Sequence, residues 1–151
     1  MRKFLVILDN TTECLNAMRF AALRAANTGG GVTIMAVIPP EEFNHWIGVA
    51  DIMREEAEDR IRAHFEVFSK RMQEKEGITP ELVIREGKAE NEIIDYIQEN
   101  PDIGVLVLGA GMGTEGPGPL VTYMTRASAT LPVPITIVPG GMSKEALIAV
   151  T

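Results

Sequence analysis

The chain has 151 residues, of which 46% are apolar and 23% are charged, and this is the composition of one ordinary globular domain. Its 14 basic and 21 acidic residues give a formal net charge of −7, which excludes the basic surface that sequence-independent nucleic-acid binding requires and disfavours docking on anionic membranes. Cys14 has no second cysteine to pair with, and the apolar run over residues 4–8 is too short for a signal peptide or a membrane span. We therefore expect a cytoplasmic protein with no nucleic-acid or membrane partner.

The first forty residues read as a strand, a helix and a second strand. The apolar, partly β-branched run over residues 4–8 predicts a buried strand. Asn10 followed three residues later by Glu13 is typical of a capped helix start, and the helical pattern that follows stops at glycines 29–31. A second apolar run covers residues 32–38. This unit predicts a right-handed crossover between two parallel strands.

The rest of the chain continues the alternation. Residues 41–50 have no clear period, and Trp46 within them would either cover a site as a lid or, as we prefer, seal the edge of the core. From residue 51 an amphipathic pattern predicts a long helix that ends at Gly77. Further strands are expected over residues 82–84, 105–108 and 135–138, further helices over residues 89–97 and 120–129, and a tail over residues 141–151 that is either frayed or a short added strand around residues 146–150.

This order of elements predicts the fold class. Five strands that alternate with four helices form an α/β domain over residues 1–140, in which helices cover both faces of a three-layer, doubly wound parallel sheet. Ligands of such sheets bind beyond the carboxyl ends of the strands, where the strand order reverses. Asp9, Val37 and the loop after Leu108 are expected at that edge.

The loop after Leu108 is rich in glycine, and we call residues 109–118 the glycine loop. Its backbone can turn sharply and bring N–H groups close to a phosphate, with a helix start behind it. It matches neither the P-loop nor the dinucleotide fingerprint, because no Gly-Lys-Ser/Thr follows and the glycine spacing differs. A connection without a ligand is the alternative. The glycines are Gly109, Gly111, Gly113, Gly116 and Gly118.

Other polar residues suggest binding more than catalysis. Asp9 either accepts hydrogen bonds from a ribose hydroxyl or an adenine amino group, or caps the helix that follows it. His45 and His64 have no acidic partner at metal spacing, and no pair of nucleophile and base emerges. Cys14 is expected to be a small core residue. The sequence therefore predicts neither a metal site nor an efficient hydrolase.

Four segments in this order resemble the universal stress protein family: FLVILD at residues 4–9, REGKAE at 85–90, GVLVLG at 104–109 and LPVPITIVP at 131–139. The resemblance spans residues 3–140. It implies strand order 3-2-1-4-5 and a homodimer formed through the last strand, residues 135–138. In nucleotide-binding members it implies ATP as ligand, with Mg²⁺ where a metal takes part. The nucleotide contacts that it implies here are Ile7, Asp9, Val37, Leu108, Gly109, Gly111, Gly113, Gly116, Gly118 and Thr122.

The glycine loop departs from the family pattern G-x2-G-x9-G-S/T. Counted from Gly109, Met112 occupies the position of the second glycine of the pattern. Thr122 is one residue closer to Gly109 than the Ser/Thr of the pattern. Glu115 would repel a triphosphate unless a metal intervenes, and two prolines in and after the loop remove N–H donors.

The sequence is therefore consistent with two functions. The slightly preferred one is a regulatory domain that binds an adenine nucleotide with little or no hydrolysis, supported by Asp9 and the glycine content. The alternative is a nucleotide-free dimeric interaction or signalling module in the stress response, supported by the altered spacing and Glu115.

Overall fold

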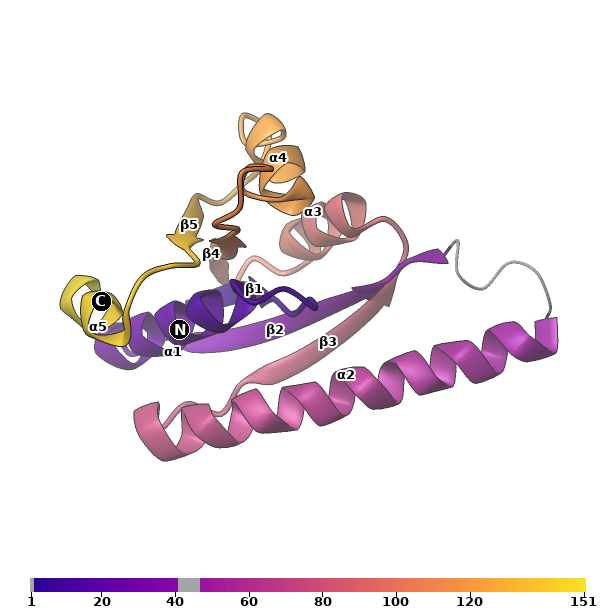
Figure 1. The fold of residues 1–151 in the computed structure, drawn as a ribbon, viewed down its shortest axis with the longest axis horizontal. Helices are drawn as coiled ribbons and strands as arrows, with labels where there is room; N and C mark the ends of the chain where they lie inside the picture. Colours follow the sequence, from indigo (N-terminus) through magenta and orange to yellow (C-terminus); the bar gives the residue numbers. More distant parts are fainter. Residues whose placement is uncertain (1, 41–46) are drawn as a thin grey trace.

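The computed structural model describes residues 2–40 and 47–151 of the chain. Within them the predicted α/β fold is confirmed: five parallel strands form one sheet in the order β3-β2-β1-β4-β5 (Figure 1). The elements are β1 (Lys3–Ile7), α1 (Cys14–Thr28), β2 (Gly31–Ile38), α2 (Ile47–Glu76), β3 (Glu81–Glu86), α3 (Ala89–Glu99), β4 (Ile103–Ala110), α4 (Pro119–Arg126), β5 (Ile135–Pro139) and α5 (Lys144–Val150).

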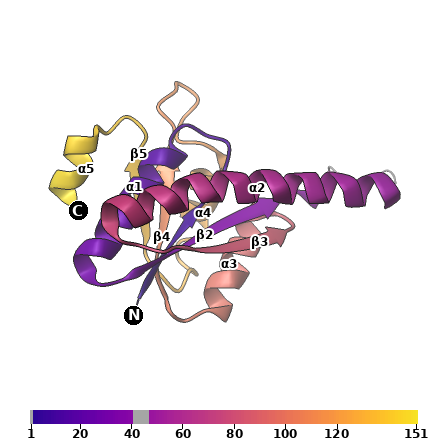
Figure 2. The same cartoon turned by 90° about the horizontal axis from the view of Figure 1, so that it is seen from below.

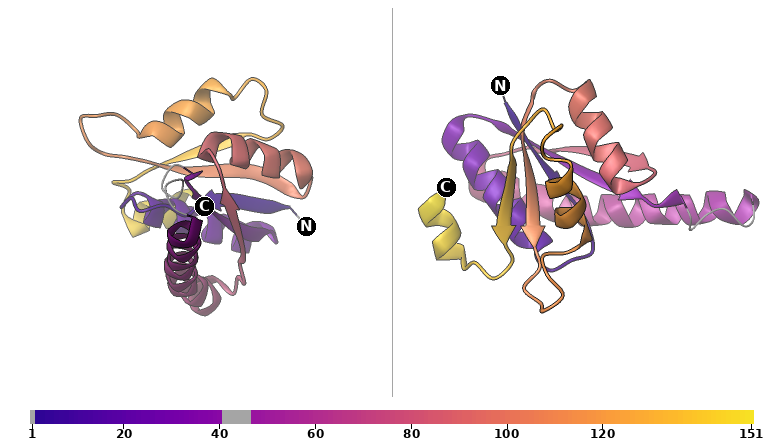
Figure 3. Two further views of the ribbon diagram at one scale, coloured as in Figure 1. Left: turned by 90° about the vertical axis from the view of Figure 1, so that its right-hand side faces the viewer. Right: turned by 90° about the horizontal axis from the view of Figure 1, so that it is seen from above.

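The helices cover both faces of the sheet in the predicted three layers. Helices α1 and α2 lie on one face and helices α3 and α4 on the other (Figure 3). Helix α2, with 30 residues, is much longer than the strands and extends beyond the sheet at one end (Figure 2). Its buried Ala57 packs with Ile38 of β2, whereas Ile52 and Met53 in the preceding turns are exposed.

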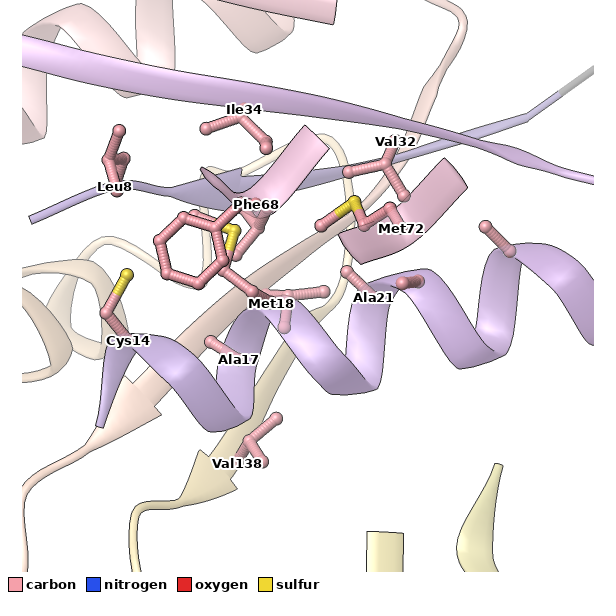
Figure 4. Packing of buried hydrophobic residues seen from close by; sticks show 14 of the residues in the cluster. Leu8, Cys14, Ala17, Met18, Ala21, Val32, Ile34, Phe68, Met72 and Val138 are labelled. Carbon is pink, nitrogen blue, oxygen red and sulfur yellow. The ribbon is translucent and has the colours of Figure 1, made fainter. Parts of the chain in front are cut away.

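Each face of the sheet has its own hydrophobic core, because successive residues of a strand point to opposite faces. Val6 packs against α1, where Phe68 and Met72 of α2 lie between that helix and β2 (Figure 4). Leu5 and Ile7 pack instead against α3 and α4. β1 and β4 are therefore buried on both sides, which is why their sequences are continuous apolar runs.

The two ends of α1 follow different rules. Gly29 ends the helix at φ 69, a left-handed conformation in which its N–H donates to the carbonyl of Ala25, as predicted. The predicted capping box at the start is wrong. The helix begins at Cys14, and Glu13 at the N-cap position makes no side-chain cap hydrogen bond.

The tail over residues 141–151 is neither frayed nor a strand. Residues 144–150 form helix α5, whose start is capped by Ser143 through a 3.1 Å hydrogen bond from the N–H of Ala146. Leu147 is fully buried against α1, and Arg24 and Asn27 of α1 donate hydrogen bonds to the carbonyl of Thr151. A single buried leucine and a side-chain cap in a short segment are weak signals, so the sequence pattern does not predict this helix.

Two further predictions concern the region before α2. The helix expected from residue 51 begins earlier, at Ile47. Trp46 and His45 lie outside the described residues, so the roles considered for Trp46 stay predictions. None of the helices within residues 2–40 and 47–151 has the length and hydropathy of a membrane span.

The double-sided burial of β4 predicts a large loss of stability when its side chains are shortened. Leu106→Ala removes a fully buried side chain and should lower the free energy of unfolding by about 2–5 kcal/mol in urea titrations. Val67→Ala, at a position 57% exposed, should change it by less than about 0.5 kcal/mol. Equal effects of the two substitutions would contradict the assignment of β4 to the core.

Candidate functional site

The carboxyl ends of β1, β2 and β4 form the edge at which ligands bind in sheets of this type. β1 pairs with β2 on one side and with β4 on the other, so the strand order reverses beside β1. The chain leaves the edge through Asp9 after β1, Pro39 after β2 and Gly111 after β4. The predicted site residues therefore lie around this switch point.

The Asp9 carboxylate is half-buried and turned back on its own chain. The N–H of Thr11 donates to its Oδ1 at 3.0 Å, and the Thr11 hydroxyl donates to the same oxygen. Asp9 therefore shapes the turn before α1 and does not cap the helix, which begins at Cys14. In the described part of the chain Oδ2 has no hydrogen-bond partner, so one carboxylate oxygen remains for a ligand.

Asp9 and Val37 line one hollow, of about 480 Å³, which we call the Asp9 hollow. Its floor is formed by the ends of β1 and β2, and its far wall by α2, which contributes Ile61, Arg60 and His64. The exposed His64 lies with its ring centroid 5.2 Å from that of Phe68. The hollow thus combines one carboxylate, two basic groups and apolar walls.

The glycine loop lines a second hollow, of about 900 Å³, which we call the loop hollow. The first two residues expected in the loop belong to β4, which ends at Ala110. The lining groups come from the start of α1, the loop and α4. Among the predicted site residues it contains Gly111, Gly113, Gly116, Gly118 and Thr122.

The predicted residues are therefore divided between two hollows, and three of them line neither. Ile7 and Leu108 are buried strand residues of the core beneath α3 and α4. Gly109 has a packing role, because a Cβ atom there would lie 2.5 Å from the backbone oxygen of Glu13. Gly140, after β5, also packs against Glu13, because a Cβ atom added at Gly140 would lie 2.8 Å from the Cβ atom of Glu13.

Asn16 completes this contact between α1 and the end of β5, and the sequence pattern did not single it out. Its side-chain amide donates to the carbonyls of Pro139, Gly140 and Met142 at 3.1, 3.0 and 2.9 Å. Asn16 is only 5% exposed. A polar side chain on the buried face of an otherwise apolar helix was the available signal, since buried amides are almost always hydrogen-bonded.

Two N–H groups of the glycine loop and both donors of Thr122 already have acceptors within the protein. The N–H of Gly111 donates to Pro117 at 3.0 Å, and that of Gly116 to Gly113 at 3.4 Å. Thr122 donates both its N–H and its hydroxyl to the carbonyl of Gly118, at 3.2 and 3.0 Å. Thr122 can therefore accept a hydrogen bond from a ligand but has no donor to spare for a phosphate.

The charges of the loop hollow are mainly negative. Glu13 and Glu115 line it together with the single guanidinium of Arg126. The sequence pattern predicts neither Glu13 nor Arg126 as a site residue. It places Glu13 in a helix cap, but the Glu13 carboxylate faces the loop, with Oε1 3.4 Å from where a Gly111 Cβ would lie. The hollow therefore opposes a ligand that carries many negative charges.

Cys14 lies beneath this edge and is buried in the core, as predicted. Its thiol donates to the carbonyl of Ile7 at 3.5 Å. Burial raises the pKa of this thiol to about 11, so the nucleophilic thiolate is scarce at neutral pH. Among the described residues no group of three metal-ligating side chains occurs.

The fold and its ligand edge define a doubly wound α/β domain with a glycine loop after the strand beside β1. A sequence model of the universal stress protein family matches residues 1–116. The chain belongs to the universal stress protein family. No curated protein sequence matches it significantly.

Solved structures share the fold at low sequence identity. The structure of hypothetical protein MJ0577 has a TM-score of 0.77 at 15% identity and covers 94% of this chain and 98% of its own. The universal stress protein from Archaeoglobus fulgidus in complex with dAMP has a TM-score of 0.59 at 19% identity, and the match covers 91% of this chain and 98% of that one. A family protein from Arabidopsis thaliana with AMP bound has a TM-score of 0.59 at 15% identity, with 92% of each chain covered.

The close approach at Gly109 predicts a stability effect that is independent of any ligand. Gly109→Ala places a methyl group against the backbone of Glu13 and should lower the free energy of unfolding by about 1–3 kcal/mol in urea titrations. Gly113→Ala, where the nearest atom to the new Cβ is 4.0 Å away, is the matched control and should have little effect. A neutral Gly109→Ala would contradict the packing role.

Proposed function

We propose that the protein is a cytoplasmic regulatory domain that binds an adenine nucleotide at this edge, with little or no hydrolysis. The observation that carries the proposal is Oδ2 of Asp9, which has no hydrogen-bond partner among residues 2–40 and 47–151 and lies in a hollow of about 480 Å³ that Asp9 shares with Val37. A carboxylate oxygen there accepts a hydrogen bond from a ribose hydroxyl or an adenine amino group. The AMP and dAMP bound to two structural relatives support this class of ligand.

In this proposal the nucleoside occupies the Asp9 hollow and the phosphate points toward the loop hollow. The base lies between the apolar side chains of Val37 and Ile61, as adenine rings do in pockets with few polar groups. Gly113 and Gly118 let the backbone come close to the phosphate, and Arg126 supplies the positive charge. Gly109 supports the loop from below.

The carboxylates of the loop hollow set the number of phosphates. Glu13 and Glu115 face one guanidinium, Arg126, so a monophosphate meets less repulsion than a triphosphate. Glu13 and Glu115 are also the groups that would hold Mg²⁺, which binds carboxylate and phosphate oxygens together. We therefore propose that AMP binds without metal and that ATP binds as its magnesium complex.

Thermal denaturation with AMP, ADP and ATP at about 5 mM, each with EDTA or with Mg²⁺, tests this proposal. A ligand present at about a hundred times its Kd stabilises the native state by about 2.7 kcal/mol, which should raise Tm by about 5 °C or more. We expect AMP to act in EDTA and ATP to need Mg²⁺. If no nucleotide moves Tm under either condition, the proposed function is wrong.

Two substitutions assign the roles of the carboxylates. Asp9→Asn should weaken AMP binding about tenfold, because a charged acceptor is replaced by a neutral amide, whereas Asp95→Asn on the exposed side of α3 should leave it unchanged. Glu115→Gln should tighten ATP binding in EDTA. Calorimetric titration measures both, and unchanged or weaker ATP binding by the Glu115 variant would show that its carboxylate does not face the phosphates.

The second candidate function is a nucleotide-free dimeric module, and the dimer that it requires is supported by the contrast between the two edge strands. β3 carries charges at both ends, with Glu81 paired to Lys3 and Glu86 to Arg54, and such charges discourage strand pairing. β5, with the sequence ITIVP, has no charge, and its Ile137 is 40% exposed. We propose that β5 forms the edge through which two copies associate, whether or not a nucleotide binds.

Light scattering at micromolar concentration tests the dimer. Ile137→Lys places a charge on the β5 edge and should shift the protein from dimer to monomer. Val67→Lys changes an equally apolar position that is 57% exposed on α2 and should leave the mass unchanged. A monomeric unmodified protein, or a dimer that survives Ile137→Lys, would refute association through β5.

A further inference from the structure

A third cavity lies away from the carboxyl edge, between α1, α2 and α5. Its volume is about 430 Å³, which is within the range of small-molecule sites. It shares no lining residue with the Asp9 hollow or the loop hollow. Figures 1 and 2 show the short α5 beside α1, on the side of the sheet that α2 also covers. We call this cavity the helical groove.

The walls of the helical groove are apolar and continuous with the core. On both α1 and α2, every lining residue has another one three or four positions away, so each helix presents one face to the groove. Met72, 3% exposed, and Leu147, fully buried, belong to the core cluster beneath α1. Space beside such a core lacks the dispersion contacts of a packed interior, and an alkyl chain would supply them. The apolar walls include Leu15, Leu23, Phe68, Met72, Leu147 and Ile148.

Four basic side chains line the groove together with these apolar residues: Arg19, Arg71, Lys75 and Lys144. Among the described residues none of the four forms an ion pair within 4.0 Å. Their mutual repulsion is visible at Lys75, whose pKa is lowered first by the charge of Lys144 and then by that of Arg71. In a protein of net charge −7, this is a local excess of positive charge that an anion would neutralise.

The one acidic residue in the groove does not neutralise the cations well. Oε2 of Glu76 is buried without a hydrogen-bond partner among the described residues. Burial raises the pKa of Glu76 although Lys75, Arg71, Lys144 and Arg19 all act to lower it. A buried carboxylate oxygen with no partner is costly, so Glu76 leaves most of the positive charge of the groove for a ligand to neutralise.

We propose that the helical groove binds an amphiphilic anion, an alkyl chain that ends in a carboxylate or a phosphate, with the chain along the apolar walls and the head group at Arg71, Lys75 and Lys144. The volume and the apolar walls select the chain, and the cations select the sign of the head group. The site is separate from the nucleotide edge, so it does not depend on the proposed function.

Calorimetric titration with decanoate and decyl phosphate, both below micelle formation, tests the proposal. We expect saturable binding of one molecule per chain. The neutral 1-decanol and the cationic decyltrimethylammonium should bind about tenfold more weakly or worse, and butyrate should not bind, because it lacks the chain. Comparing decanoate with decyl phosphate shows whether the groove prefers a carboxylate or a phosphate head group. Equal affinity for decanoate and decanol would overturn the proposal, and so would the absence of saturable binding by both anions.

Matched variants locate the site. Arg71→Gln and Lys75→Gln should each weaken decanoate binding about threefold to fivefold, and together about tenfold or more. Lys70→Gln, exposed on the same helix outside the groove, should not change it. Glu76→Gln should tighten binding, because it removes a negative charge beside the head group. Unchanged affinity in the double variant would overturn the assignment.

A steric variant separates binding in the groove from binding elsewhere. Leu23→Trp fills space in the groove at a half-buried position of α1 and should abolish decanoate binding while circular dichroism shows an intact fold. AMP binding, measured on the same preparations, should be unaffected in every groove variant. If Leu23→Trp and the double variant instead change only the oligomeric state, the groove is an interface between copies and the proposal is wrong.

Discussion

The first turn of α1 approaches the ends of β4 and β5 so closely that two positions tolerate no side chain. Gly109 and Gly140 both face Glu13, and Asn16 ties the same turn to the chain after β5 through three hydrogen bonds. This contact fixes where the chain runs between Asp9 and α1. Thr12 and Glu13 of this turn line the loop hollow, whereas Asp9 and Asn10 just before them line the Asp9 hollow. The geometry of the site thus depends on backbone packing before any ligand is considered.

Within this frame the two hollows differ in their electrostatics. The Asp9 hollow has one carboxylate, with Arg60 and His64 on its α2 wall, whereas the loop hollow has two carboxylates for one guanidinium. A glycine-rich loop is usually considered a phosphate cradle because of its free N–H groups. Here Gly111 and Gly116 use theirs within the loop, so only the other N–H groups of the loop are left for a phosphate. In the proposed function, the charges of the loop hollow rather than its glycine content set the number of phosphates.

The sheet could be predicted from sequence because its central strands are buried on both faces, and a short, uninterrupted apolar run between turn residues is typical of such strands. The glycine cap at Gly29 could be predicted too, because it follows from local chemistry. The direction of the Glu13 side chain could not be predicted, since it depends on Gly109 and Gly140, which are distant in the sequence. Helix α5 could not be predicted because its stability comes from one buried side chain, Leu147, and from contacts with α1 that no local pattern reveals.

Helix α5 has only seven residues, and a helix of this length is not stable in water by itself. It exists because Leu147 is docked on α1, and it forms one wall of the helical groove. When α5 undocks, that wall is lost and the apolar face of α1 meets water. Segments held by so few contacts open locally far more often than the whole domain unfolds. The groove therefore depends on α5 being docked, and a ligand that binds in it, as proposed, should slow hydrogen exchange in α5.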